Sequence, residues 1–226
     1  MATGVQVRRM SRQLGGWSGV LGVAVPIIGV VIMPIWQFPR TSATPAQISA
    51  FVAEHVPALK AMMLLYTLGV GLWLVFGAAV WALLRESLPS ASPLPTCFAA
   101  GAIGYVTLLL AGFTAFDVLT YRNLDPHVGQ ALYDLTFGLL AMSGVPTAIA
   151  LFAFAAAVRQ NGVLPQRSGH LADITAAAHL LLLASFIVTT GFFSLEGLVI
   201  VAVPALLWIW IADTGALLLR TGRLAT

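Results

Sequence analysis

Carboxylates are the residues of this chain best suited to acid–base chemistry, and their positions divide the eight of them into two sets. The set at the end of the helices predicted to face outward is Glu54, Asp117, Asp125, Asp134 and Glu196. The inner set is Glu86, Asp173 and Asp213. A carboxylic acid that apolar surroundings keep protonated can protonate an alkene or an epoxide. The predicted candidates for such a catalytic acid are Glu54, Asp117, Asp134 and Glu196, with Asp213 as the inner alternative.

Asp213 lies about two helical turns inside the apolar segment WIWIADTGALLLR, residues 208–220. An aspartate at that depth costs about 2–3 kcal/mol if it faces lipid, so we expect it to face the bundle interior or a wet cavity. Folding the last two spans about the SLEG stretch (194–197) lets Asp173, His179 and Asp213 share one layer. Asp213 then either forms a packing hydrogen bond between helices or handles protons or substrate.

Aromatic side chains are the second chemical resource, because their faces stabilise cations. Trp73 and Trp208 fall near the middle of apolar runs, whereas Trp36 and Tyr121 fall at run ends, as is typical of interfacial anchors. Core packing and pocket lining are alternative roles for each of them. The candidates for substrate binding are Trp36, Tyr66, Trp73, Phe113, Tyr121, Phe137 and Trp208.

Motifs for metal or nucleotide chemistry are missing from the sequence. It contains no HExxH, no P-loop, no GxSxG and no GxGxxG before a strand. Four scattered histidines, two on each predicted side, do not form a multi-histidine centre, and the lone Cys97 excludes an internal disulfide and a Cys-based metal site. We therefore expect a function without a metal ion or a cofactor.

Composition indicates the environment in which these residues act. Hydrophobic residues make up 59% of the chain and charged residues 8%, against about 25% charged in a typical soluble domain. The apolar residues form continuous runs long enough for a membrane helix, which needs about 20 residues, and they do not alternate as barrel strands do. The sequence therefore predicts an all-α polytopic membrane helix bundle, a single domain over residues 1–226, with the lipid bilayer as its partner.

Six transmembrane spans are predicted, at residues 17–36, 61–84, 97–120, 131–158, 171–193 and 196–219. The basic flank and apolar run at the N-terminus are also typical of a signal peptide. The run exceeds the 7–15 residues of a signal-peptide core, which favours a retained first span. Prolines 26, 146 and 204 fall near the middle of spans and predict kinks that open a central cavity.

A short interfacial helix is predicted over residues 44–56, directly after the first span. Thr44 and Gln47 have the spacing of a capping box, and Pro45 occupies the first helical position. Apolar residues on one face of this segment are typical of a helix in the membrane interface. Such a helix is either a lid over the outer mouth of the bundle or a plain connector.

Basic residues are distributed unequally between the two sides of the predicted spans. The side of the N-terminus carries Arg8, Arg9, Arg12, Arg85, Arg159, Arg167, Arg220 and Arg223. The other side carries Arg40, Lys60 and Arg122. This bias predicts a multi-pass protein of the cell membrane with both termini in the cytoplasm. Because the basic residues are spread thinly at helix ends, the pI of about 9.5 does not indicate a nucleic-acid partner.

Two stretches carry a resemblance to known proteins, FPRTSATPAQISAFVAEH after the first span and NGVLPQRSGHLADI between the fourth and fifth. Both resemble stretches of small actinobacterial integral membrane proteins without an assigned function. The size and span pattern are also similar to the small integral membrane terpene cyclases of meroterpenoid and indole-terpenoid pathways. That similarity implies metal-free, acid-initiated cyclisation of a prenyl or epoxyprenyl chain by two membrane-embedded acids. Glu54 and either Asp213 or Glu196 would be those acids.

Three functions remain open on the sequence. The first is a membrane enzyme that acts on a hydrophobic, isoprenoid-like substrate by carboxylic-acid catalysis, which needs a closed pocket lined by two or more acids. The second is a small-molecule or proton-coupled transporter, which needs polar groups across the full membrane thickness. The third is a non-catalytic membrane subunit, which needs a large apolar flank and no internal pocket. The oligomeric state stays open in all three.

Overall fold

The computed structural model describes residues 2–40, 42–188, 190–195 and 197–223, and this part of the chain is helical without strands. The helices are α1 (Ala2–Ile32), α2 (Pro45–Ser87), α3 (Leu94–Tyr121), α4 (Pro126–Met142), α5 (Gly144–Asn161), α6 (Gln166–Leu180) and α7 (Val199–Arg223), with short 3₁₀ helices η1 (Ile35–Gln37) and η2 (Leu181–Phe186). Six segments are long and apolar enough to cross a membrane. The predicted all-α six-helix membrane bundle is therefore confirmed.

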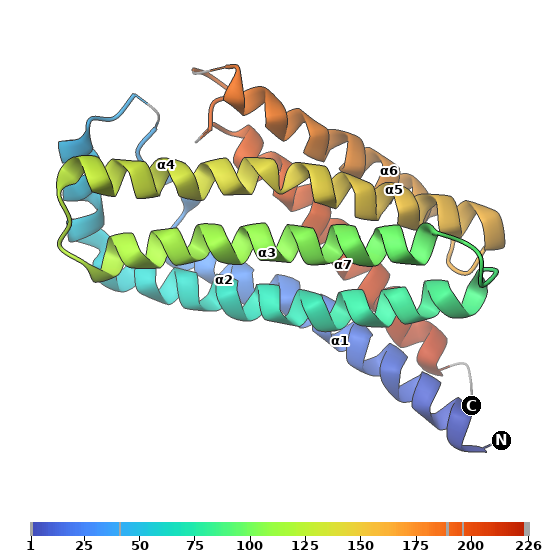
Figure 1. Cartoon of the computed structure of the whole chain (residues 1–226). Coiled ribbons are helices and arrows are strands. Elements are labelled where there is room, and N and C mark those ends of the chain that lie inside the picture. Colours follow the sequence, from blue (N-terminus) through green and yellow to red (C-terminus); the bar gives the residue numbers. More distant parts are fainter. Residues whose placement is uncertain (1, 41, 189, 196, 224–226) are drawn as a thin grey trace.

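The helices run up and down along one axis (Figure 1). In the view of Figure 1, α2, α3 and the α4–α5 pair lie in front, and α1 and α7 pack behind them. Both termini lie at one end of the bundle, together with the α2–α3 and α5–α6 connections. That end is called the inner end below, and the opposite end the outer end.

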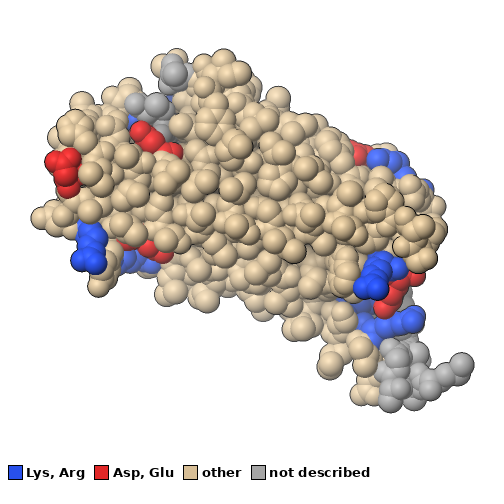
Figure 2. All heavy atoms as spheres, viewed as in Figure 1, with Lys and Arg blue, Asp and Glu red and all other residues tan. Residues whose placement is uncertain are grey.

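Charged side chains gather at the two ends of the molecule. On the face drawn in Figure 2, Lys, Arg, Asp and Glu lie at the left and right ends, and an uncharged band separates them. Charge within the hydrocarbon core of a bilayer is costly, so this distribution suits a bundle that crosses the membrane along its long axis. On this face the charged side chains are thus sorted by depth.

The segment 44–56 is not a separate interfacial helix. It forms the first turns of α2, which runs unbroken for 43 residues and is therefore about 65 Å long, more than twice the roughly 30 Å of a bilayer core. The predicted capping box is confirmed, because the Thr44 N–H donates to Gln47 Oε1 at 2.8 Å and the Gln47 N–H donates to Thr44 Oγ1 at 3.3 Å. Pro57 does not end the helix: its side chain is exposed, while Leu59 just beyond it is fully buried.

The fourth and fifth spans are each predicted as one continuous helix, and in the structure neither is. Residues 131–158 belong to two helices, α4 and α5, which meet at Ser143. Pro146, just inside α5, has no N–H to donate to the Met142 carbonyl one turn earlier, which helps to explain the break. The span predicted to end at residue 193 loses α-helical geometry at Leu181 and ends with η2 at Phe186. The described residues of 187–188, 190–195 and 197–198 form no helix, so the predicted hairpin confined to SLEG is wrong in its described part.

Glycines let several helix backbones touch. A Cβ atom on Gly101 of α3 would lie 2.5 Å from the Pro146 carbonyl oxygen and 2.7 Å from the Ala150 nitrogen of α5. A Cβ on Gly144 of α5 would lie 2.2 Å from the His179 carbonyl oxygen of α6. These oxygen and nitrogen atoms belong to the backbone and cannot rotate away, so the packing of α3, α5 and α6 requires glycine at these two positions.

We predict that Gly101→Ala destabilises the bundle. The added methyl group meets the α5 backbone, and overpacking of this kind costs about 1–3 kcal/mol. Unfolding of the purified protein in mixed micelles, titrated with a denaturing detergent, measures the change. Gly71→Ala on the lipid-facing side of α2 is the matched control, because nothing lies within 4 Å of its added Cβ. Equal unfolding midpoints for the two variants would show that the α3–α5 contact is looser than described.

Candidate functional site

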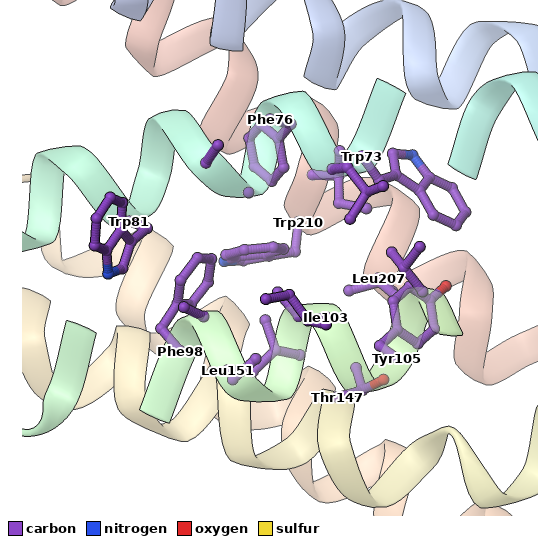
Figure 3. A pocket seen from close by; sticks show the side chains of 18 residues that line it. Trp73, Phe76, Trp81, Phe98, Ile103, Tyr105, Thr147, Leu151, Leu207 and Trp210 are labelled. Carbon is purple, nitrogen blue, oxygen red and sulfur yellow. The ribbon is translucent and has the colours of Figure 1, made fainter. Parts of the chain in front are cut away.

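A cavity of about 410 Å³ lies between α2 and α3, with α5 and α7 behind it (Figure 3). Its walls come from residues between 73 and 81 of α2, 98 and 106 of α3, 147 and 151 of α5, and 207 and 211 of α7. Leu74 and Ile103 line it and are 43% and 59% exposed, so the cavity opens sideways through the uncharged band. We call this cavity the lateral pocket.

Small residues on facing helices create the lateral pocket. Gly77 and Ala78 of α2 face Ala99 and Ala102 of α3, and a Cβ on Gly77 would lie 3.8 Å from the Ala102 Cβ. Side chains this short leave the space between the two helices unfilled. The pocket thus follows from the sizes of residues that face each other across two helices.

Aromatic rings form the back and the two ends of the lateral pocket. Trp210 of α7 lies in its centre, with its ring centroid 5.7 Å from that of Phe76. In Figure 3, Trp81 marks one end of the pocket, and Trp73 and Tyr105 mark the other. No charged residue is among the lining residues. The pocket can therefore hold an apolar molecule.

A smaller cavity of about 70 Å³ lies behind the stacked rings of Trp73 and Tyr105, which line both cavities. It is called the inner cavity below because it lies inside the bundle, and the name does not refer to the inner end. Pro26 and Pro204, two of the three prolines predicted to open a central cavity, line the inner cavity. Pro146 does not line it, but the helix break at Ser143 does. Two prolines inside helices and one helix break thus lie around the same cavity.

Four of the predicted substrate-binding aromatics gather around the inner cavity, namely Tyr66, Trp73, Phe113 and Trp208. The Tyr66 ring centroid lies 5.9 Å from that of Phe113 and 6.5 Å from that of Trp208. The Trp73 centroid also lies 6.5 Å from that of Trp208. Trp73 is the one of the four that also lines the lateral pocket.

The other three predicted aromatics line neither cavity. Phe137 packs at the outer end, with its ring centroid 6.2 Å from that of Phe38. Trp36 and Tyr121 are 58% and 73% exposed, and the ammonium nitrogen of Lys60 lies 5.7 Å from the Tyr121 ring centroid. The exposure of both rings, and the cation beside Tyr121, suit the interfacial anchors that the sequence also allowed.

The predicted outer acids do not meet in a pocket. Glu54 and Asp117 are exposed, and Asp134 is half-buried in α4. Glu196 lies outside the described residues. Neither the lateral pocket nor the inner cavity has a carboxylate among its lining residues. Among the described residues, no carboxylic acid is therefore placed to donate a proton into either cavity.

The inner acids form ion pairs with arginines. Asp213 accepts a hydrogen bond from Arg167 Nη2 at 3.1 Å, and its side chain is 30% exposed. Asp173 accepts a hydrogen bond from Arg159. His179 is buried at the inner cavity and donates through Nδ1 to the Thr175 carbonyl oxygen at 2.8 Å. No hydrogen bond or ion pair among the described residues joins Asp173, His179 and Asp213 to one another, although Asp213 is half of a polar pair with Arg167.

Sequence reasoning missed the residues that shape the lateral pocket, among them Gly77, Phe98, Ala102 and Trp210. A signal for them exists in the runs of small residues at 77–79 and 99–102, which lie in the middle or the inner half of two adjacent spans. Small residues in membrane helices more often mark close helix contacts, so the runs alone do not predict a cavity.

Comparisons with known proteins give no match: no family model, no curated protein and no solved structure matches the chain. The resemblances to actinobacterial membrane proteins and to membrane terpene cyclases therefore stay predictions.

We predict that Asp213 and Arg167 contribute to stability only modestly. Both side chains are partly exposed, and such pairs are worth about 0.2–1 kcal/mol. A double-mutant cycle of Asp213→Asn and Arg167→Gln, followed by unfolding in mixed micelles, measures their coupling. A coupling of several kcal/mol would instead indicate a desolvated pair with a role beyond the interface.

Proposed function

We propose that this protein binds a lipid-soluble, isoprenoid-like chain that enters the lateral pocket from the bilayer. The observation that carries the proposal is the apolar cavity of about 410 Å³ with its opening between α2 and α3. This volume lies within the range of about 300–1,000 Å³ that is typical of small-molecule sites. The opening lies in the uncharged band, so a ligand reaches the pocket without crossing water.

The energetics of the pocket favour an occupant. Atoms that line an unfilled space lack van der Waals partners on one side. Because the lateral pocket opens towards the bilayer, either a lipid chain or a specific ligand can supply these contacts. A chain that fills the pocket restores these contacts and stabilises the bundle.

Binding is supported better than the two alternatives of catalysis and transport. Acid-initiated cyclisation needs a carboxylic acid beside the substrate, and the lining of the lateral pocket contains none. A carrier needs polar groups through the whole membrane thickness. Among the described residues, the ion pairs within 4.0 Å lie at the inner end, and the walls of the pocket are apolar. These ion pairs therefore do not extend across the membrane as a carrier's polar path would.

We predict that Gly77→Leu prevents ligand binding. The new side chain extends into the lateral pocket, and its Cβ fits without a clash, with Ala102 Cβ as its nearest neighbour at 3.8 Å. Photolabelling of the protein in phosphatidylcholine nanodiscs with a diazirine analogue of farnesol measures binding, and peptide mass spectrometry maps the labelled residues. Wild-type protein is expected to carry the label on α2 and α3 at the pocket, and Gly77→Leu to lose most of it.

Gly71→Leu is the matched control, because it makes the same change on the same helix where nothing lies within 4 Å of the Cβ. Its labelling is expected to equal that of the wild type. Equal labelling of Gly71→Leu and Gly77→Leu, or label spread evenly over the lipid-facing surface, would refute binding in the lateral pocket.

We also propose that the inner end faces the cytoplasm, because the arginines concentrate there. Single cysteines at Ser90, in the α2–α3 connection, and at Asn123, between α3 and α4, report the two sides in a Cys97→Ala background. In intact cells a membrane-impermeant maleimide is expected to label position 123 and to spare position 90 until the cells are opened. The reverse pattern would show the opposite orientation.

A further inference from the structure

A positive charge lies beside the inner end of the lateral pocket. Trp81 lines the pocket there, and Arg85 lies one helical turn further along α2. Arg85 is not itself a lining residue, but its guanidinium carbon lies 5.3 Å from the centroid of the Trp81 ring, so the cation lies next to a residue of the pocket wall. An apolar chamber with a cation at one end matches an amphiphile.

Arg85 keeps its charge uncompensated within the described residues. Each of the three inner carboxylates forms an ion pair with another arginine. Glu86 Oε1 lies 3.7 Å from Arg8 Nε, and the two inner aspartates pair with arginines of α5 and α6. No described carboxylate lies within 4.0 Å of the Arg85 side-chain nitrogens. A guanidinium stacked on an indole still presents its N–H edge, which suits the two oxygens of a phosphate or a carboxylate.

The dimensions of the site favour one hydrocarbon chain. From Trp73 to Arg85 the helix rises by about 18 Å, which separates the closed end of the pocket from the cation. The volume of about 410 Å³ lies near the lower limit of the range of about 300–1,000 Å³ for small-molecule sites. The second chain of a phospholipid would have to remain in the bilayer.

We propose that the ligand is a single-chain lipid with an anionic oxygen head group, phosphate or carboxylate. Arg85 binds the head group at the inner membrane interface, and the chain lies in the lateral pocket and extends towards Trp73. This inference rests on the proposed function, to which it adds the charge of the ligand, its direction and the side of the membrane from which it binds.

Competition against the diazirine farnesol label in phosphatidylcholine nanodiscs tests the head group. The competitors are farnesyl phosphate, farnesoate and farnesol, which share one chain, and their concentrations are expressed as mole fractions of the bilayer lipid. For the wild type, the two anions are expected to compete about tenfold more strongly than farnesol, as a charge-assisted hydrogen bond allows. The relative strength of the two anions distinguishes a phosphate from a carboxylate ligand.

Variants at the inner end assign the effect to Arg85. Arg85→Gln is expected to remove the advantage of the anions and to leave farnesol competition unchanged, whereas Arg85→Lys keeps most of the advantage. Arg220→Gln removes a charge from the inner end nine residues beyond Ile211, the last residue of α7 that lines the pocket, and is expected to behave as wild type. Dioleoyl phosphatidylglycerol, with two chains, is expected to compete weakly.

The outcomes separate this inference from the proposed function. Anions that compete no better than farnesol, or an anion advantage that survives Arg85→Gln, overturn the anionic head group while binding of the chain stands. Competition by dioleoyl phosphatidylglycerol as strong as that by farnesyl phosphate overturns the single chain. If Gly77→Leu is labelled as strongly as the wild type, or if neither is labelled, both proposals are overturned.

Discussion

Direct contact between helix backbones is the interaction on which the bundle depends. In a bilayer the hydrophobic effect does not drive helices together, so van der Waals contact at small residues must do so. Gly101 and Gly144 provide it between α3, α5 and α6, and Gly16 provides it between α1 and α7, where its Cβ would lie 2.8 Å from the Gly215 carbonyl oxygen. Between α2 and α3 the small residues at Gly77 and Ala102 do not close up in the same way, and the lateral pocket results. One residue class thus forms contact or cavity, depending on how closely the two helices approach.

Charged side chains and cavities occupy different depths of the bundle. Charged residues lie at the ends, where water and head groups solvate them, and both cavities lie in the apolar band between. A ligand of the lateral pocket therefore meets aromatic and aliphatic walls along its length and a cation, Arg85, only at its inner end. This arrangement suits retention and orientation of an amphiphile better than proton transfer to it.

Asp213 and Pro57 illustrate how local sequence arguments succeed and fail. The depth of Asp213 correctly predicted that it would need a polar partner, but the partner is Arg167 near the start of α6, not Asp173 or His179. Pro57 is a strong local signal for a helix end, yet α2 continues through it because the ring is exposed and residues on either side pack into the bundle. In both cases the outcome depends on the rotation of one helix against its neighbour.

The sequence by itself determined the helical class, the six spans, the Thr44 capping box and the concentration of charge at the helix ends. These features follow from transfer free energies and hydrogen bonds between residues close in the chain, which a single sequence contains. Tertiary structure alone decided that Gly77 and Ala102 face each other across a space, that Trp210 lies in its centre and that Arg85 lies next to Trp81 at its inner end. The physical reason is that a cavity is set by the distances between helices far apart in sequence, and those distances depend on all the side chains packed between them.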